Sequence, residues 1–500
     1  MAELDNMLFD VVVIGGGING CACAADAPLR GLSVLLCEQD DLASKTSSSS
    51  TKLIHGGLRY LEYFDFPLVK KSLQERRRLL KLAPHLVNPL PIFLPQTIST
   101  RPAWLLKLGL FIYDNLTRHN GLPKSRRIHR DEKSSYLTPL SSSLNNGFLF
   151  YDCTTDDARL TIANAIQARE HGATILTQTA LIHAETQDNQ WVLTLETKGK
   201  KIIHIKAKAI INAAGPWVEP VNKLLSIPLD HAVSLIKGSH IVVNKLYEGN
   251  HAYMLQDDAN RIVFVVPYHG FSLIGTTEVP VKNPFSSIEI EASEINYLLN
   301  TINHYFDKKL QNLDVINSWS GVRQLISVKG KNMTALSRDY LCDYENQPAP
   351  SVTLFGGKIT TYRRQAETAL NLLRPLFPDI PDSHTPNYPL PGATLDDMCF
   401  EDYKVYAKSK YHWLDHKTLE RYIHSYGTKT ETLLNGCKNL VDLGICFADT
   451  LYQVEVDYLI HEEWARTVED VIWRRTKLGL CMMQEDVNKL TSYFSKQFTL

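Results

Sequence analysis

The 500-residue sequence is poor in cysteine, has no long apolar run and carries almost no net charge. Its nine cysteines include no CxxC pair and no Cys/His ligand set, which argues against a disulfide scaffold and against a metal site. No apolar run approaches the roughly 20 residues of a membrane-spanning helix. A formal charge of −1 gives no reason to expect nucleic acid as a partner. Because residues 1–10 are acidic and lack the plan of a signal peptide, we expect a cytoplasmic protein, or one on the cytoplasmic face of a membrane.

The chain begins with the pattern of a βαβ unit. Residues 9–14 form an apolar, β-branched run that predicts a buried parallel strand, and residues 33–37 predict a second strand that ends at Glu38. We expect a helix over about 19–29 between them. The joining segment Gly15–Gly20 matches G-x-G-x-x-G, whose glycines let the backbone approach a pyrophosphate at a helix N-terminus. This context predicts a dinucleotide site, with Glu38 as acceptor for the adenosine ribose hydroxyls, but it does not separate FAD from NAD.

The rest of the chain alternates between predicted helices and strands. Residues 155–172 predict a capped helix, and mainly strands follow it. These strands are expected at 190–197, 201–214, 239–243, 261–266, 271–274 and 351–355. A further helix is expected from 359 to about 377, followed by a proline-rich join and a mostly helical tail.

Several distant glycine turns favour FAD over NAD, because one cofactor that touches all of them is large. They are His55-Gly56-Gly57 after the hydroxyl-rich segment 46–51, Ala214-Gly215-Pro216 after a strand, and Gly356-Gly357-Lys358 after another. A serine-rich linker is the alternative interpretation of 46–51. That alternative suits the following segment poorly. Burying His55, Arg59 and Tyr60 around a Gly-Gly turn costs free energy, which favours a functional role for them.

Together these segments resemble the flavin-linked glycerol-3-phosphate dehydrogenases, specifically the aerobic, quinone-reducing bacterial enzymes. The similarity runs along nearly the whole chain, and its motifs keep the family's order and spacing. The matching segments are Val13–Gly20, Lys52–Glu62, Asp156–Leu160, Ile236–Val243, Gly275–Thr277, Ser320–Arg323, Ser337–Tyr340, Phe355–Arg363 and Glu463–Asp470. Three local departures are Pro28 within the first helix, Gln324 where the family often has proline, and Glu278 in place of aspartate.

The resemblance implies an α/β flavoprotein of the glutathione-reductase/amino-acid-oxidase type. It implies a Rossmann-like FAD-binding domain, a β-rich substrate domain and a C-terminal helical cap. We expect the FAD-binding domain to comprise 1–85, 145–225 and 335–388, the substrate domain 86–144 and 226–334, and the cap 389–500.

The resemblance also implies the reaction, which is oxidation of sn-glycerol 3-phosphate to dihydroxyacetone phosphate by hydride transfer from C2 to N5 of FAD. A base must take the hydroxyl proton, and histidine titrates in the right range. His55 is the first candidate and His240 the second. For either, the alternative is a core histidine that is satisfied by backbone hydrogen bonds.

The substrate phosphate requires fixed positive charge, which arginine supplies best. Arg59, Arg323 and Arg338 are the candidates, and a surface location is the alternative for each. Arg323 is also a candidate to polarise the C2 oxygen. The remaining expected substrate contacts are Tyr60, Thr276 and Lys358.

Lys358 and the helix that begins near it are expected to stabilise the negative charge that develops on the flavin. The other residues expected to contact FAD lie mainly at strand ends, in glycine turns and in the hydroxyl-rich segment. They are Ile14, Gly15, Gly17, Ile18, Asn19, Gly20, Glu38, Thr46, Ser47, Ser50, Thr51, Lys52, Leu53, Ala180, Ala214, Gly215, Trp217, Gly357 and Thr360.

The family implies ubiquinone as electron acceptor, peripheral contact with the cytoplasmic face of the inner membrane, and a place in glycerol catabolism that feeds the respiratory chain. A homodimer is a further expectation. The basic stretch 70–82 and the apolar stretch 102–116 are both candidates for membrane contact. The alternative is a solvated basic helix followed by a core helix.

Three other functions stay open from the sequence. The first is an oxidase of the same substrate that reduces O₂ to H₂O₂. The second is an FAD amine or amino-acid oxidase. The third is a nucleotide-binding protein without catalytic activity.

Overall fold

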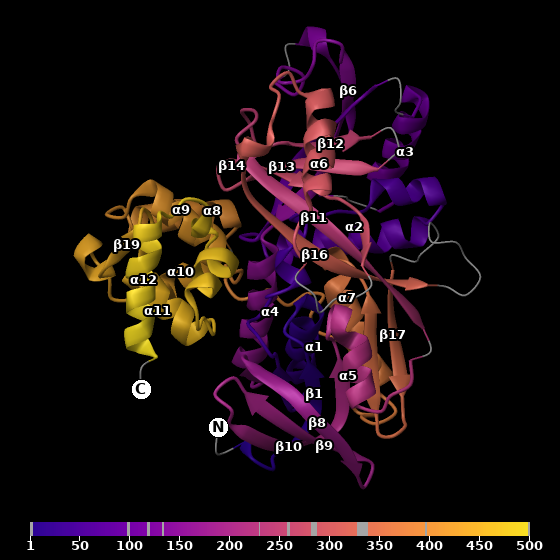
Figure 1. Cartoon of the computed structure of the whole chain (residues 1–500), viewed down its shortest axis with the longest axis vertical. Helices are drawn as coiled ribbons and strands as arrows, with labels where there is room; N and C mark the ends of the chain where they lie inside the picture. The colour runs from indigo at the N-terminus through magenta and orange to yellow at the C-terminus, as the bar shows by residue number, and fades with distance from the viewer. Residues whose placement is uncertain are drawn as a thin grey trace.

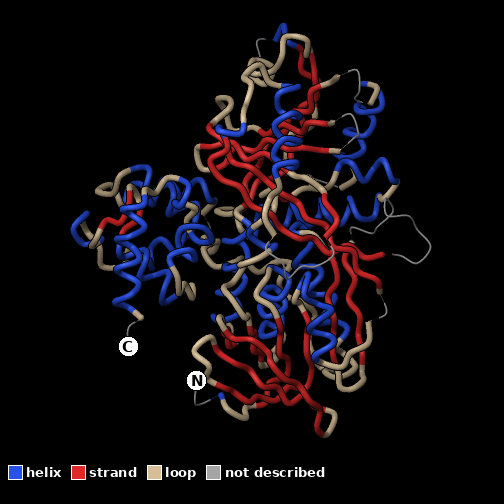
Figure 2. Tube along the Cα trace, viewed as in Figure 1, coloured by secondary structure: helices blue, strands red, loops and turns tan. Residues whose placement is uncertain are grey.

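The computed structural model consists of two large β-sheets with helices packed on them and a helical C-terminal region at one side (Figures 1 and 2). It describes residues 4–97, 101–117, 121–132, 135–229, 231–257, 261–281, 288–327, 339–395 and 398–498. We call the C-terminal region, residues 398–498, the cap.

The first sheet is built around strand β1, which lies between two parallel neighbours. Its strand order is β17-β18-β10-β1-β2-β7, with the β8–β9 hairpin attached to β10. Side chains alternate along β1, so Val11 and Val13 face helices α1, α4 and α7, while Val12 and Ile14 face the β9–β10 side. Burial on both faces explains the continuous apolar run that predicted this strand.

The bounds of these elements are β1 Leu8–Ile14, α1 Ile18–Leu29, β2 Val34–Cys37, α4 Asp157–Glu170, β7 Thr174–Leu176, β8 Thr179–Gln187, β9 Gln190–Thr197, β10 Ile202–Asn212, β17 Tyr340–Glu345, β18 Ser351–Gly356 and α7 Tyr362–Leu372. The predicted βαβ unit and the strands at 190–197, 201–214 and 351–355 are therefore confirmed. The helix predicted over 359–377 is too long. It starts with a 3-10 turn at Ile359–Thr361 and ends before Pro375, which disfavours helical backbone at the residue before it.

The second sheet holds ten strands, most of them antiparallel. Its centre is the long pairing of β11 with β16, and β11 also pairs with β14 and β15. The bounds are β3 Leu53–Ile54, β4 Val87–Pro95, β5 Arg126–His129, β6 Asn146–Thr155, β11 Ala232–Asn244, β12 Ala252–Gln256, β13 Ile262–Tyr268, β14 Phe271–Gly275, β15 Val279–Val281 and β16 Val315–Ser327. Helix α6 (Ala292–Tyr305) packs on one face through Leu298 and Ile302. The strands predicted near 239–243, 261–266 and 271–274 are confirmed.

The cap has a hydrophobic core of its own, formed largely by aromatic and leucine side chains such as Tyr422 and Leu459. Its helices are α8 Phe400–Lys410, α9 His416–Tyr426, α10 Thr430–Leu433, α11 Gln453–Glu462 and α12 Gln484–Gln497, with a short pair of strands, β19 Cys446–Ala448 and β20 Leu451–Tyr452. The mostly helical tail is thus confirmed. In Figure 1 the cap lies beside the rest of the molecule, next to α4.

The basic stretch 70–82 lies in α2 (Phe66–Leu82), and some of its basic side chains form ion pairs within the protein. Arg76 is fully buried and pairs with Asp152. Arg78 pairs with buried Glu75, and Lys71 lies 3.0 Å from Asp339. At least three of the six basic side chains of this stretch thus have acidic partners among the described residues, which leaves less charge for a lipid surface. In the part of the chain that the structure describes, no helix is both long and apolar enough to cross a membrane.

Candidate functional site

A cavity of about 520 Å³ lies at the carboxyl ends of the parallel strands of the first sheet. Ile14 and Glu38 line it at the ends of β1 and β2, and segments 213–217 and 356–359 line it after β10 and β18. Residues of β11 and β16 close it from the second sheet. Parallel α/β sheets bind ligands at this edge, and the volume is typical of a small-molecule site.

The predicted glycine turn forms one wall of the cavity. Gly15 has φ of +112°, and a Cβ there would come within 2.7 Å of the carbonyl oxygen of Ala213. Gly17 precedes α1 and lines the cavity, and a Cβ there would meet only the hydroxyl of Ser47, 3.1 Å away. The backbone at the N-terminus of α1 is therefore open to the cavity, as a bound pyrophosphate requires. Gly20 does not line the cavity, because it packs directly on the carbonyl group of Gly15.

Glu38 stands beside this turn at the cavity edge. Its carboxylate accepts hydrogen bonds from the backbone N–H groups of Gly16 (2.6 Å) and Asp40 (2.8 Å). Burial raises the pKa of Glu38, although these two N–H groups lower it. The side chain is thus fixed in one orientation at the edge of the pocket, which suits an acceptor for sugar hydroxyls.

The hydroxyl-rich segment 46–51 is part of the cavity wall and not a linker. Ser47 Oγ accepts a hydrogen bond from the N–H of Ile18 (2.9 Å), and Thr46 Oγ1 donates one to the carbonyl of Val322 (2.7 Å). Lys52, expected to contact the cofactor, does not line the cavity. Its ammonium group is buried and bonds to Asp157 (2.7 Å) and to the carbonyl of Ser48.

His240 is the buried histidine of the cavity. Its Nε2 lies 2.9 Å from Thr51 Oγ1, and its ring stacks on Trp319 at 5.8 Å between centroids. Nδ1 is buried and has no hydrogen-bond partner among the described residues. Burial, together with the positive charges of Lys52 and Arg323, lowers the pKa of His240 to about 3. The ring is therefore neutral at physiological pH.

His55 also lines the cavity, and its backbone is held by Thr360. The N–H of His55 donates to Thr360 Oγ1 (3.1 Å), whose hydroxyl in turn reaches the His55 carbonyl (3.2 Å). Thr360 itself does not line the cavity, since it is buried behind this contact.

Positive charge reaches the cavity from two elements. Arg323, on β16, has one guanidinium nitrogen 3.4 Å from Glu278 Oε1. Lys358, after β18, has its ammonium nitrogen 3.7 Å from the ring centroid of Tyr60. Arg323, Lys358, Tyr60 and Thr276 all line the cavity, so four of the expected substrate contacts lie in one site.

Of the other two expected arginines, only Arg59 is among the described residues. Arg59 lies on the 3-10 helix Leu58–Tyr63 and does not line the cavity. Arg338 lies outside the described residues. The role of either residue stays a prediction.

Most of the expected cofactor contacts do line the cavity. They are Ile14, Gly15, Gly17, Ile18, Asn19, Glu38, Thr46, Ser47, Ser50, Thr51, Leu53, Ala180, Ala214, Gly215, Trp217, Gly357 and Lys358. Helix α5 (Val218–Leu224) adds an apolar wall that was not predicted, in which Pro220, Val221 and Leu224 line the cavity. A helix of seven residues has too short a periodic pattern to predict such a wall.

Comparison with known proteins agrees with this geometry. Residues 10–340 match the family described as FAD dependent oxidoreductase, and residues 383–494 match the C-terminal domain of alpha-glycerophosphate oxidase. The structure superimposes on a glycerol-3-phosphate dehydrogenase from Bacillus halodurans complexed with FAD, with a TM-score of 0.80, 24% identity and coverage of 100% of this chain and 92% of the other. This superposition bears out the predicted flavoprotein fold.

Full-length relatives are closer in sequence. A glycerol-3-phosphate dehydrogenase from Pseudomonas aeruginosa is 43% identical over 494 residues, which cover 98% of this chain and 96% of the relative. A D-erythritol 1-phosphate dehydrogenase from Brucella abortus is 40% identical over 491 residues, with 97% of each chain covered. The glycine turn, the open N-terminus of α1 and the fixed carboxylate of Glu38 fit FAD as the cofactor. This chain belongs to the FAD-dependent oxidoreductases, within the family of the glycerol-3-phosphate dehydrogenases.

Proposed function

We propose that the protein oxidises the C2 hydroxyl of sn-glycerol 3-phosphate to the ketone of dihydroxyacetone phosphate. The observation that carries this proposal is that Arg323, Lys358 and His240 line the same cavity as the glycine turn. Two cations and a neutral imidazole are what a phosphorylated alcohol needs for binding and for loss of its hydroxyl proton. Bound FAD supplies the acceptor of the hydride.

We propose that the glycine turn and the hydroxyl-rich segment hold FAD. The backbone at Gly15 and Gly17 and the N-terminus of α1 would bind the pyrophosphate, and Glu38 would bind the adenosine ribose. Lys358, near the start of α7, would stabilise negative charge on the flavin ring.

We propose His240 as the base, ahead of His55. His240 lines the cavity and is neutral, and its buried Nδ1 has no hydrogen-bond partner among the described residues. Thr51 fixes the other ring nitrogen and Trp319 fixes the ring plane. Arg323 would bind the phosphate or the C2 oxygen. Its contact with Glu278 is long and partly exposed, and such a contact contributes little free energy.

A second candidate substrate is D-erythritol 1-phosphate. It is favoured by the Brucella abortus relative, which is named as a dehydrogenase of this compound. It is also a phosphorylated polyol, so the same cations and the same base would serve it.

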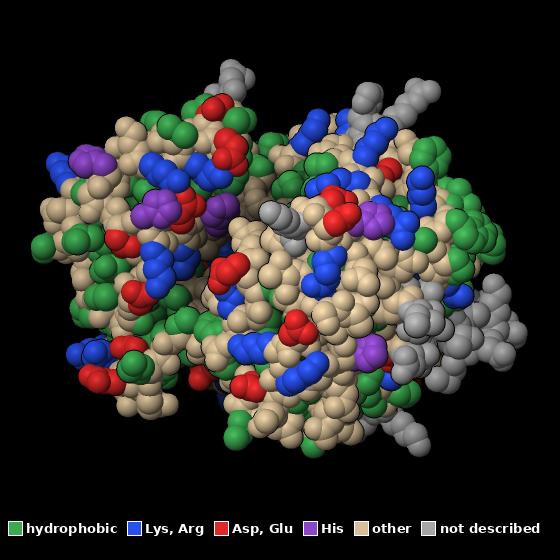
Figure 3. Space-filling model, turned by 90° about the horizontal axis from the view of Figure 1, so that it is seen from above, with side chains coloured by type: hydrophobic (Ala, Val, Ile, Leu, Met, Phe, Trp, Pro, Cys, Tyr) green, Lys and Arg blue, Asp and Glu red, His purple; other side chains and the backbone are tan. Residues whose placement is uncertain are grey.

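We further propose that the electrons pass to a membrane quinone and that helix α3 (Ala103–Asn115) contacts the bilayer. In α3 only Leu110 and Tyr113 are buried, while Trp104 is 69% and Phe111 64% exposed. The interpretation as a core helix does not fit this exposure. Figure 3 shows hydrophobic side chains gathered at the right-hand edge, the side on which α3 lies in Figure 1. An exposed apolar helix face of this kind binds in the interfacial region of a bilayer.

The first prediction concerns the glycine turn. Gly17→Val should weaken FAD binding at least about tenfold, because a branched side chain would fill the space beside the start of α1. The backbone tolerates the change, since φ at Gly17 is −78°. FAD release on dilution of the holoenzyme measures the effect. Gly109→Ala is the control, because its Cβ would have no neighbour within 4 Å, and equal affinity in both variants would contradict the assignment.

The second prediction concerns the substrate. Glycerol 3-phosphate added without oxygen should bleach the visible flavin absorption of the holoenzyme, while glycerol should not, because glycerol lacks the phosphate for Arg323 and Lys358. D-erythritol 1-phosphate is compared at the same concentrations. A higher kcat/KM for that compound would transfer the assignment to the second candidate. Bleaching by neither phosphate would exclude the proposed substrate class.

The third prediction concerns the base. His240→Asn should slow this bleaching about 100-fold or more with FAD still bound, because general-base catalysis contributes about that much. Stopped-flow absorbance measures the rate. The matched variant is His55→Asn, and a larger loss there than in His240→Asn would return the role to His55.

The fourth prediction concerns the membrane. Trp104→Ser combined with Phe111→Ser should reduce cosedimentation with vesicles of neutral and anionic lipid several-fold, without change in flavin bleaching. Val441→Ser is the control, since Val441 lies on the cap and is 86% exposed. Unchanged vesicle binding in the double variant would exclude α3 as the contact. Peroxide formation in air at the full rate of turnover would favour the oxidase over the quinone-linked enzyme.

A further inference from the structure

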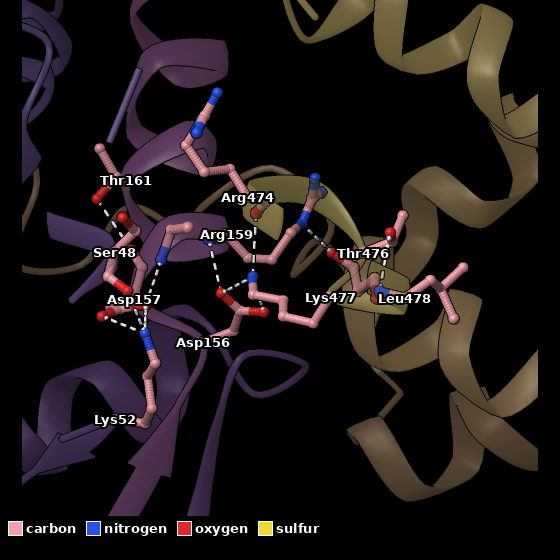
Figure 4. Close-up of polar contacts among 12 residues, drawn as sticks. Ser48, Lys52, Asp156, Asp157, Arg159, Thr161, Arg474, Thr476, Lys477 and Leu478 are labelled. Atoms are coloured by element: carbon pink, nitrogen blue, oxygen red, sulfur yellow. Dashed lines mark hydrogen bonds and ion pairs between the residues drawn. The ribbon is translucent and has the colours of Figure 1, made fainter. Parts of the chain in front are cut away.

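The cap supplies none of the described residues that line the cavity, yet buried charged groups tie it to the cavity walls. Arg475 of the cap bonds to Asp41 (2.8 Å), and Glu463 of the cap accepts a hydrogen bond from Arg159 of α4 (2.9 Å). Lys477 of the cap forms an ion pair with Asp156 (Figure 4). Burying this many charged groups is costly unless their partners are fixed, so the cap is held in one position.

Lys477 extends from the cap with an unusual backbone. Its φ is +59°, in the left-handed region that lysine rarely adopts, and its side chain is only 4% exposed. The ammonium group donates to the Asp156 carboxylate and to the carbonyl of Arg474 (3.0 Å). Burial disfavours the charged form of the Asp156 carboxyl group and raises its pKa. Lys477 and the N–H of Arg159 together outweigh this effect, so the pKa of Asp156 lies below its usual value. Burial lowers the pKa of Lys477, although Asp156 opposes this shift. The pairing is specific because the ammonium group donates to both carboxylate oxygens of Asp156.

On the other side of the contact, Asp156 starts the helix that holds the cavity wall. Asp156 caps α4 by accepting from the N–H of Arg159 (3.0 Å). The next residue, Asp157, accepts from the N–H (3.0 Å) and the hydroxyl (2.6 Å) of Ser50 and from the ammonium of Lys52. These bonds set segment 48–52, and Figure 4 shows the Lys52 ammonium group at Asp157 and the Lys477 ammonium group at Asp156.

From segment 48–52 the connection continues into the reacting end of the cavity. Ser50 and Thr51 line the cavity, and Thr51 bonds to His240. The Lys52 ammonium also lies 5.1 Å from the centroid of the Trp319 ring, on which His240 stacks.

The second tie reaches the wall that carries Glu38. Asp41 accepts hydrogen bonds from Arg475 and Arg474, and it belongs to the loop after β2. Glu38 and Ala43 of this loop line the cavity, and the N–H of Ala43 donates to the carbonyl of Gly16 (3.0 Å).

We propose that the cap is a positioning element for the FAD site, and that Lys477, through Asp156 and the first turn of α4, holds segment 48–52 in the conformation that binds the cofactor. When only a fraction of the molecules has the binding conformation, the apparent dissociation constant rises by the inverse of that fraction. Because the inference concerns the cofactor, which the family assigns, it holds whichever phosphorylated polyol is the substrate.

Lys477→Met tests this proposal at the N-terminal end of α4, and a control variant acts at the C-terminal end of α4. Lys477→Met should raise the dissociation constant of FAD about tenfold and change the visible circular dichroism of the bound flavin, while Lys477→Arg should restore both. The control is Lys429→Met, which removes the cap's ion pair with Glu170 at the far end of α4 and should leave both within about twofold. FAD release on dilution of the holoenzyme gives the constant. No change in Lys477→Met, or equal changes in Lys477→Met and Lys429→Met, would overturn the proposal.

A double variant distinguishes a positioning role of Lys477 from the destabilisation that an unpaired Asp156 carboxylate would cause. Asp156→Asn with Lys477→Met leaves no buried charge without a partner, and asparagine still caps a helix well. If Lys477 acts by positioning, FAD binding stays weak in the double variant while its melting temperature matches that of the unchanged protein. A return of FAD affinity to normal in the double variant would overturn the proposal.

Discussion

The structure depends on two consecutive carboxylates at the start of α4, whose charges are compensated from opposite sides. Asp157 is fully buried against Lys52, and Asp156 receives Lys477 from the cap. Breaking such a buried pair typically costs about 3–5 kcal/mol, because the remaining charge stays in a poor solvent. Each lysine is far from α4 in sequence, so these two pairs join three distant segments at one helix terminus. The cofactor cavity lies directly beside this junction.

Local patterns of the sequence were enough to predict β1, β2, β9, β10 and β18 of the first sheet, but not β7, β8 and β17. Pairings between strands that are distant in sequence could not be predicted from such patterns. The run 9–14 is apolar throughout because both faces of β1 are buried, which gives an unambiguous signal. Strand β16 pairs along nearly the whole of β11, but its segment has no simple alternation and was not predicted. Register between distant strands is set by packing, which no short pattern records. Helix α3 shows the same limit, since its apolar composition suits a core as well as a bilayer.

The lining of the cavity was predictable from the sequence at the glycine turn. A glycine turn between a strand and a helix has one stable geometry, so Gly15 and Gly17 were placed from the sequence. Side chains that act at a distance were harder to place. Lys52 lies among the cofactor-facing residues in sequence but bonds to Asp157, and Arg59 lies beside Tyr60 but does not line the cavity. Adjacent residues of an extended or 3-10 segment point to different faces, so a residue next to one that lines the cavity need not line it as well.

The depressed pKa of His240 has a consequence for selectivity. Burial disfavours a proton on this ring, and the positive charges of Lys52 and Arg323 disfavour it further, so the ring is a weak base. A phosphate dianion beside Arg323 would offset that positive field and strengthen the base at the moment the substrate binds. An uncharged polyol of the same shape would leave the imidazole weak. The phosphate would then do more than anchor the molecule, because it would also raise the basicity of the histidine that we propose as the base.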